Sequence, residues 1–92
     1  MQDTLRSQSF FLVDDHTAIL NGTAMSLKQE FPEAEIAMAQ TAQEARQKLA
    51  TLHPDLIIVD LSLPETKGAT CRTETGINLL REFLEIYETY NF

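Results

Sequence analysis

Cysteine, long apolar runs and basic charge are all scarce in this chain of 92 residues. Its one cysteine, Cys71, has no partner for an internal disulfide, which fits a reducing compartment and an expected cytoplasmic location. No apolar run exceeds four residues, whereas a membrane span needs about 20, and the chain does not open on a basic segment followed by an apolar stretch. We therefore expect no membrane segment and no signal peptide.

Basic side chains are outnumbered, with 7 lysines and arginines against 14 acidic residues and a net charge of −7. Nucleic acids and anionic membranes need basic patches, so we expect no direct binding of either by this segment. Apolar residues make up 43% of the chain and charged residues 23%, which is typical of a globular protein rather than a disordered one. The length allows one small domain with a thin core, spanning residues 1–92.

Two short apolar runs, Phe10–Val13 and Leu56–Val59, are the clearest landmarks. They are rich in aromatic or β-branched residues and show no polar alternation, which indicates parallel strands buried on both faces. A more polar stretch, Ala34–Ala39, has Ile36 and Met38 on one side and predicts a strand at the edge of the sheet.

Three helices are predicted from apolar residues that recur at helical spacing. These residues are Leu20, Ala24, Leu27 and Phe31 in the first helix, Ala42, Ala45, Leu49 and Leu52 in the second, and Ile77, Leu80, Leu84 and Tyr87 in the third. Thr41 and Glu44 have the spacing of a capping box at the start of the second helix. The third helix is predicted to begin at Gly76, after an exposed loop over residues 65–75 that lacks apolar periodicity.

The resulting order, β-α-β-α-β-α, predicts an α/β fold with right-handed crossovers and a parallel sheet. A helical bundle is the alternative, but it would require the two apolar runs to be helical. If the strand order is 2-1-3, the first and third strands are neighbours. Asp14 and Asp15 after the first strand and Asp60 after the third would then meet at one edge of the sheet, where ligands bind in such folds.

Three close carboxylates repel one another and call for a hard cation. Oxygen ligands with room for water suit Mg²⁺, and such a site predicts phosphoryl chemistry in which one carboxylate acts as nucleophile. His16 follows the acidic pair, but a hard Mg²⁺ site prefers oxygen ligands. We therefore interpret His16 as a loop or helix-start residue rather than a ligand.

The segments Phe10–His16 and Leu56–Pro64, and the spacing between them, resemble the receiver domain of two-component response regulators. The Asp14-Asp15-His16 run, with Gly22 six residues after the histidine, more particularly resembles receivers of the LuxR/NarL class. The resemblance covers residues 8–90. It implies a partial flavodoxin-like (CheY-like) sheet with strand order 2-1-3.

The resemblance also implies a role for each matched residue. Asp60 matches the aspartate that accepts phosphate from a histidine kinase, a phosphotransfer protein or a small phosphodonor. Asp15 matches the direct Mg²⁺ ligand, and Asp14 matches its partner, which acts through metal-bound water. Asp60 would contribute to the metal site, as would Ser62 through its backbone carbonyl. Pro64 matches the proline that follows in the loop.

The chain departs from the family pattern in two ways. Receivers have five strands in the order 2-1-3-4-5, whereas this pattern ends after the third helix, so the resemblance implies a receiver truncated there. The hydroxyl residue ending the fourth strand and the lysine ending the fifth would then be absent, although Lys67 could reach the same crevice. The loop containing Gly68 also carries an insertion of about eight residues before the predicted helix.

These observations favour a non-enzymatic phosphorelay module that controls a DNA-binding output domain outside this chain. An alternative is a receiver fragment that cannot be phosphorylated and acts only as an interaction module, with a homodimer formed through the exposed edge of the third strand. A metal-dependent phosphatase of the haloacid dehalogenase type is disfavoured. That class needs an aspartate two residues after its nucleophile, where this chain has Ser62 after Asp60 and His16 after Asp14.

Overall fold

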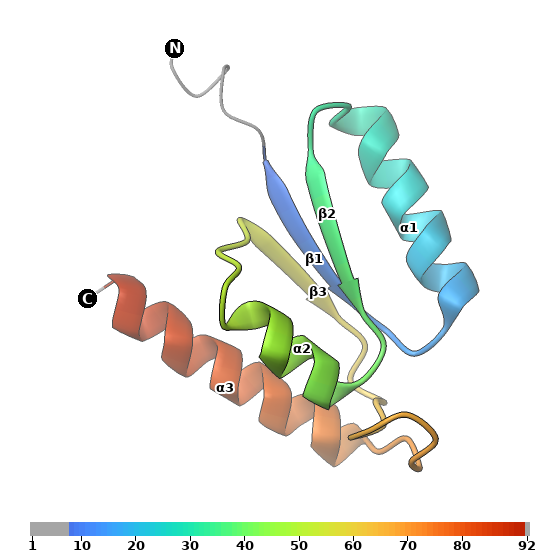
Figure 1. Cartoon of the computed structure of the whole chain (residues 1–92), viewed down its shortest axis with the longest axis vertical. Coiled ribbons are helices and arrows are strands. Elements are labelled where there is room, and N and C mark those ends of the chain that lie inside the picture. The colour runs from blue at the N-terminus through green and yellow to red at the C-terminus, as the bar shows by residue number, and fades with distance from the viewer. Residues whose placement is uncertain (1–7, 92) are drawn as a thin grey trace.

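The computed structural model describes residues 8–91, and within them the predicted order of elements is confirmed (Figure 1). The elements are β1 (Ser9–Val13), α1 (Thr17–Glu30), β2 (Glu35–Ala39), α2 (Ala42–Leu49), β3 (Leu56–Val59) and α3 (Thr73–Asn91). All pairing is parallel and the strand order is β2-β1-β3, so the predicted α/β fold with order 2-1-3 is correct. The predicted domain range 1–92 extends beyond the described part by residues 1–7 and 92.

Side chains of the central strand alternate between two layers. Phe11 pairs in register with Ala37 of β2 and Ile57 of β3. It belongs to the main core cluster, which forms against α2 and α3 and comprises Phe11, Val13, Ala39, Ala42, Ala45, Leu49, Leu63, Leu79 and Phe83. The opposite face lies under α1, where the ring of Phe10 meets that of Phe31 edge-on at 5.3 Å. Helices therefore cover both faces of the sheet at β1.

The start of α2 is capped as its spacing predicts, with one difference in partner. The hydroxyl of Thr41 accepts a hydrogen bond from the backbone N–H of Glu44 at 3.0 Å. The carboxylate of Glu44 accepts from the backbone N–H of Gln40, also at 3.0 Å, and not from that of Thr41. Both bonds satisfy donors that a helix start would otherwise leave unpaired, and they fix the entry into α2.

The third helix differs from its prediction in both its start and its packed face. It begins at Thr73, because a short antiparallel bridge between Leu63 and Arg72 ends the loop there. Leu79 and Phe83 are buried. The residues predicted to form the packed face are exposed, by 41%, 40%, 56% and 61% for Ile77, Leu80, Leu84 and Tyr87.

Gly76 explains this rotation of α3. A Cβ atom at this position would lie 1.9 Å from the carbonyl oxygen of Leu61 and 2.4 Å from its carbonyl carbon. Glycine therefore lets the helix axis approach the segment after β3 more closely than any other residue would. The residues one and two turns further along the same side, Leu79 and Phe83, are then the ones directed into the core.

The prediction that β3 is buried on both faces is correct for one face only. Ile57 and Val59 pack against the core cluster, whereas Leu56 and Ile58 are 46% and 42% exposed. Within residues 8–91, β3 is an edge strand, and α1 packs against the central strand β1. No helix among the described residues is both long enough and apolar enough to cross a membrane.

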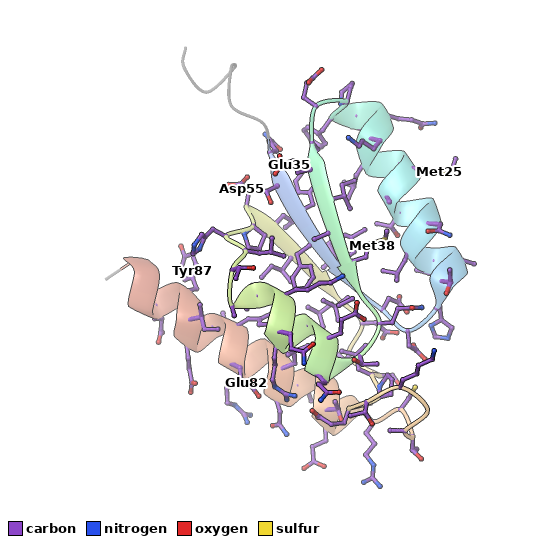
Figure 2. The ribbon with its side chains drawn as sticks, in the orientation of Figure 1. Met25, Glu35, Met38, Asp55, Glu82 and Tyr87 are labelled. Atoms are coloured by element: carbon purple, nitrogen blue, oxygen red, sulfur yellow. The ribbon has the colours of Figure 1, made fainter. Side chains whose placement is uncertain are left out.

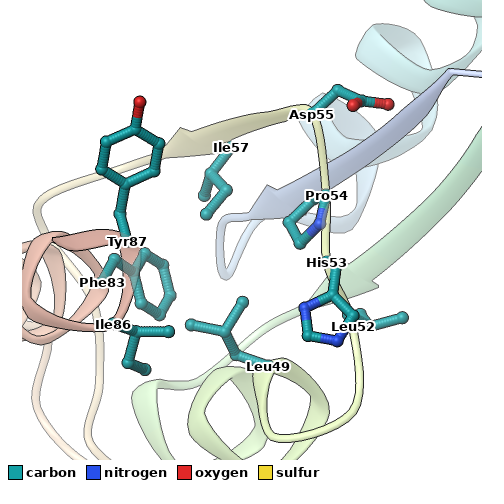
Figure 3. A pocket seen from close by; sticks show the side chains of 9 residues that line it. All are labelled: Leu49, Leu52, His53, Pro54, Asp55, Ile57, Phe83, Ile86 and Tyr87. Atoms are coloured by element: carbon teal, nitrogen blue, oxygen red, sulfur yellow. The ribbon is translucent and has the colours of Figure 1, made fainter. Parts of the chain in front are cut away.

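A groove of about 450 Å³ lies at the amino-terminal end of β3 (Figure 3). Its apolar walls come from Leu49 of α2, Ile57 of β3, and Phe83 and Tyr87 of α3. Asp55 marks this end of the sheet and is labelled in Figure 2. Asp14, Asp15 and Asp60 follow the carboxyl ends of the strands, at the opposite edge of the sheet. The groove is therefore separate from these three residues.

Candidate functional site

The acidic residues are placed by an extension of the hydrogen-bond ladder beyond β1 and β3. The backbone N–H of Asp14 donates to the carbonyl of Ala39 at 3.0 Å, and that of Asp60 donates to the carbonyl of Val13 at 2.8 Å. Each aspartate is thus held as the first residue past its strand. Because parallel strands end at the same edge of the sheet, the two carboxylates are brought to the same place.

Asp14, Asp15 and Asp60 converge, as the sequence predicts. One ligand atom from each of these residues and from His16 lies within 4.8 Å of the others. The three carboxylates are partly buried, with exposed side-chain fractions of 14%, 24% and 32% in chain order. Partly buried like charges at this separation need a compensating positive charge.

Two of the aspartates also organise their own turns. Oδ1 of Asp14 accepts a hydrogen bond from the backbone N–H of His16 at 2.9 Å, and Oδ1 of Asp60 accepts from the backbone N–H of Ser62 at 3.1 Å. Such bonds from a side chain to the backbone two residues on are typical of aspartate in turns. They hold each carboxylate in one orientation and leave its second oxygen available.

Asp15 lies where a cation could bind. Its Oδ1 atom is buried and accepts no hydrogen bond among the described residues, and it lies 3.1 Å from Nδ1 of His16. A single imidazolium charge does not balance three carboxylates. Carboxylate oxygens gathered in this way form a donor set that fits Mg²⁺.

His16 lies at the start of α1, as interpreted from the sequence, and its side chain is 61% exposed, but Nδ1 of its ring faces the acidic cluster. Its Nδ1 atom is 2.9 Å from Oδ1 of Asp14, 3.1 Å from Oδ1 of Asp15 and 3.9 Å from Oδ2 of Asp60. The hydrogen bond to Asp14, followed by the charge of Asp15, raises the pKa of His16. The protonated ring therefore stabilises the fold at low pH, and this contribution is lost as pH rises through the raised pKa.

The loop after Asp60 is anchored at both ends. The first backbone N–H groups of α2, at Ala42 and Gln43, donate to the carbonyls of Pro64 and Glu65, each at 3.0 Å. At the other end, the N–H of Arg72 donates to the carbonyl of Leu63 at 3.0 Å. Residues 65–72 between these anchors are exposed, as predicted, and the loop stands beside the acidic cluster.

The loop brings Cys71 to the acidic cluster, and nothing in the sequence around Cys71 predicts this position. Its thiol donates to Oδ2 of Asp15 at 3.1 Å, and this bond raises the pKa of the thiol. Asp15 and Cys71 also line a polar hollow of about 600 Å³ together with Lys67. Lys67 therefore stands near the site, while its contact with a phosphoryl group stays a prediction. Metal binding by the backbone carbonyl of Ser62 also stays a prediction. Ser62 is an exposed residue two positions after Asp60.

Arg46 of α2 connects the loop to α3, and no motif in the sequence predicts this role. Its Nε donates to Oε1 of Glu82 at 2.7 Å, and its guanidinium also pairs with the carboxylate of Glu65. Glu82, labelled in Figure 2, projects from α3. The two carboxylates raise the pKa of Arg46, so it stays charged and holds the loop and α3 to α2.

Two known proteins match this chain in sequence over part of their length. The chain is 33% identical over 63 residues to protein-glutamate methylesterase/protein-glutamine glutaminase 3 of Vibrio cholerae, a match that covers 68% of the chain and 18% of that protein. It is 35% identical over 60 residues to protein-glutamate methylesterase/protein-glutamine glutaminase 2 of Carboxydothermus hydrogenoformans. That match covers 64% of the chain and 17% of that protein. The chain thus spans less than a fifth of these relatives.

A solved structure of the Salmonella typhimurium RcsB response regulator, described in terms of DNA interaction, has a similar fold. The TM-score is 0.64 at 23% identity, and the match covers 84% of this chain and 37% of that one. The model of the response regulator receiver domain family matches residues 10–88, which include β2, β3, all of β1 except Ser9, the acidic cluster and the anchored loop. The chain therefore belongs to the response regulator receiver domain family.

Proposed function

We propose that this receiver takes part in phosphorelay signalling by accepting a phosphoryl group on Asp60 in a Mg²⁺-dependent reaction. The observation that carries the proposal is the convergence of three carboxylates at the carboxyl ends of β1 and β3, with Oδ1 of Asp15 buried among them. Asp14, Asp15 and Asp60 would hold the cation, with the carbonyl of Ser62 as a further ligand. The donor would be a histidine kinase, a phosphotransfer protein or a small phosphodonor.

The chemistry would run through Asp60. Its carboxylate oxygen forms a bond to phosphorus while the phosphorus–nitrogen bond of the donor breaks, and the departing nitrogen takes up a proton. The N–H of Ser62 holds Oδ1, which fixes the orientation of the attacking group. Mg²⁺, when bound, neutralises the charge gathered by the phosphoryl oxygens and the carboxylates.

We also propose a place in the LuxR/NarL class, supported by the Asp14-Asp15-His16 run and Gly22. The output domain of this class binds DNA and would lie outside the present chain. The fold similarity to RcsB is compatible with this proposal but does not carry it, because fold alone does not fix function.

A second candidate function is an interaction module that dimerises and accepts no phosphate. Two observations favour it: the face of β3 that bears Leu56 and Ile58 is exposed, and β3 is an edge strand within residues 8–91. An apolar strand edge is a template for another chain. Lack of labelling by a phosphodonor would support this candidate over the first.

Incubation of the chain with phosphoramidate and Mg²⁺ is expected to add one phosphoryl group, measured by intact mass spectrometry. Replacing Mg²⁺ by an excess of EDTA should lower the labelling rate by at least about tenfold, because the carboxylates then repel the incoming anion uncompensated. Equal labelling with and without the metal would refute the Mg²⁺ dependence. No labelling under either condition would refute the proposed phospho-acceptor role.

A further inference from the structure

Arg46 of α2 is shared by two acidic side chains that come from different parts of the chain. Its Nε and Nη2 atoms donate to Oε1 and Oε2 of Glu82 at 2.7 and 3.1 Å, which makes a bidentate ion pair with α3. Its Nη1 atom donates to Oε2 of Glu65, in the loop after Asp60. One guanidinium therefore connects the loop to both helices of this layer.

Glu65 is the residue through which α2 holds this loop. Its backbone carbonyl accepts a hydrogen bond from the N–H of Gln43 at 3.0 Å, and its carboxylate accepts from Arg46, three residues further along the same helix. Residues three apart lie on one side of a helix, so both bonds hold Glu65 on the same side of α2. The next turn, in which the N–H of Ala69 donates to the carbonyl of Thr66 at 3.0 Å, starts directly after this residue.

The segment that follows Glu65 brings Lys67 and Cys71 to the acidic cluster. Sγ of Cys71 lies 3.1 Å from Oδ2 of Asp15, and Lys67 lines the polar hollow that these two residues also line. The cluster gathers three carboxylates, which repel the anionic phosphodonor that the proposed reaction needs. A lysine at the edge of the cluster offsets part of this repulsion.

The two ion pairs of Arg46 have different consequences. The pair with Glu82 joins α2 to α3, two helices that also share the core cluster (Figure 2). The pair with Glu65 joins α2 to an exposed loop, and the side chain of Glu65 is 51% exposed. An ion pair this exposed contributes little to the stability of a fold. Its effect is to select one arrangement of the loop.

We infer that Arg46 is a positioning residue for phosphoryl transfer, because its ion pair with Glu65 holds the loop where Lys67 attracts the phosphodonor. The inference rests on the proposed function for the reaction itself, whereas the placement of the loop stands without it. The ion pair with Glu82 has a separate role, the packing of α3 against α2. Experiments can therefore separate the two pairs.

Glu65→Ala and Glu82→Ala form a matched pair of variants, because each removes one carboxylate from the same guanidinium. Hydrogen exchange measured by NMR reports on the loop without any phosphodonor. In Glu65→Ala, the amides of Gln43 and Ala69, which bond to loop carbonyls, should exchange at least about threefold faster. Arg46→Gln should have the same effect. In Glu82→Ala, both amides should exchange within about twofold of the unmodified chain.

Labelling by phosphoramidate with Mg²⁺ tests the consequence for the reaction. In dilute salt, Glu65→Ala, Arg46→Gln and Lys67→Ala should each label at least about threefold more slowly than the unmodified chain. Glu82→Ala should label within about twofold of it. Adding Lys67→Ala to Glu65→Ala should cause no further loss, since both changes act through the same lysine. Lys67→Arg keeps the charge and should label like the unmodified chain.

Salt distinguishes attraction of the donor from a loss of stability. Near about 1 M salt, the deficits of Glu65→Ala and Lys67→Ala should fall below about twofold, because screening removes the attraction of an exposed charge. A deficit that persists undiminished at high salt would contradict the role of Lys67. So would additive losses in the double variant.

The outcomes separate this inference from the proposed function. Unchanged exchange at Gln43 and Ala69 in both Glu65→Ala and Arg46→Gln would overturn the placement of the loop by Arg46. Equal acceleration in Glu82→Ala would overturn it too, because the effect would then be a general loosening. Failure of the unmodified chain to accept phosphate would instead count against the proposed function, and the exchange result would still stand.

Discussion

Asp60→Asn is expected to reduce labelling by phosphoramidate by a factor of about 10³ or more, to the level of background, because the nucleophilic oxygen is replaced by an amide. The substitution keeps the size of the side chain and one oxygen that can accept the hydrogen bond from the N–H of Ser62. The fold should therefore survive. Circular dichroism with thermal unfolding would show this, while intact mass spectrometry measures the labelling.

Asp55→Asn is the matched control for this loss. Asp55 precedes β3, at the opposite end of the strand from Asp60, and accepts a hydrogen bond from the backbone N–H of Ser9 at 2.8 Å. The change removes the same negative charge without touching the acidic cluster. Labelling of Asp55→Asn should equal that of the unmodified chain, and labelling of Asp60→Asn at a comparable rate would contradict a role for Asp60.

Gly76→Ala is expected to destabilise the fold, because the added methyl group would collide with the backbone. Its Cβ would lie 1.9 Å from the backbone oxygen of Leu61, and backbone atoms cannot move aside as a side chain can. Overpacking of this kind costs about 1–3 kcal/mol or more, whereas alanine in a helix gains only about 1 kcal/mol over glycine. A net loss of up to about 2 kcal/mol in the free energy of unfolding is expected by urea titration.

Gly22→Ala should change stability in the opposite direction. Gly22 lies within α1, and no atom stands within 4 Å of the place its Cβ would take. The helix propensity of alanine then acts alone and should raise the free energy of unfolding by about 0.5–1 kcal/mol. Equal stabilisation of both variants would contradict the close approach of α3 to Leu61.

The fold could be predicted because its signals are local. Continuous apolar runs mark β1 and β3, and the alternation of Ile36 and Met38 marks β2. Helical periodicity marks α1 and α2, and the spacing of Thr41 and Glu44 marks the start of α2. The packed face of α3 could not be read in this way, because both of its sides carry apolar residues. The choice between Leu79 and Leu80 depends on the contact of Gly76 with Leu61, which is set by tertiary structure.

The candidate site also has a part that could be predicted from the sequence and a part that could not. Asp14, Asp15 and Asp60 could be placed together because each follows a strand and the strand order brings β1 beside β3. The ring position of His16 depends on the turn made by Asp14, and the approach of Cys71 depends on how the loop returns to Leu63. Neither arrangement leaves a periodic pattern in the sequence.

The position of the phosphoryl group on the labelled chain is the most direct test of the account. Borohydride reduces an acyl phosphate to an alcohol, and peptide mass spectrometry then locates the changed residue. We predict the change at Asp60 and at no other carboxylate among residues 8–91. A stable phosphoryl group on His16, or reduction at Asp14 or Asp15 in place of Asp60, would contradict it.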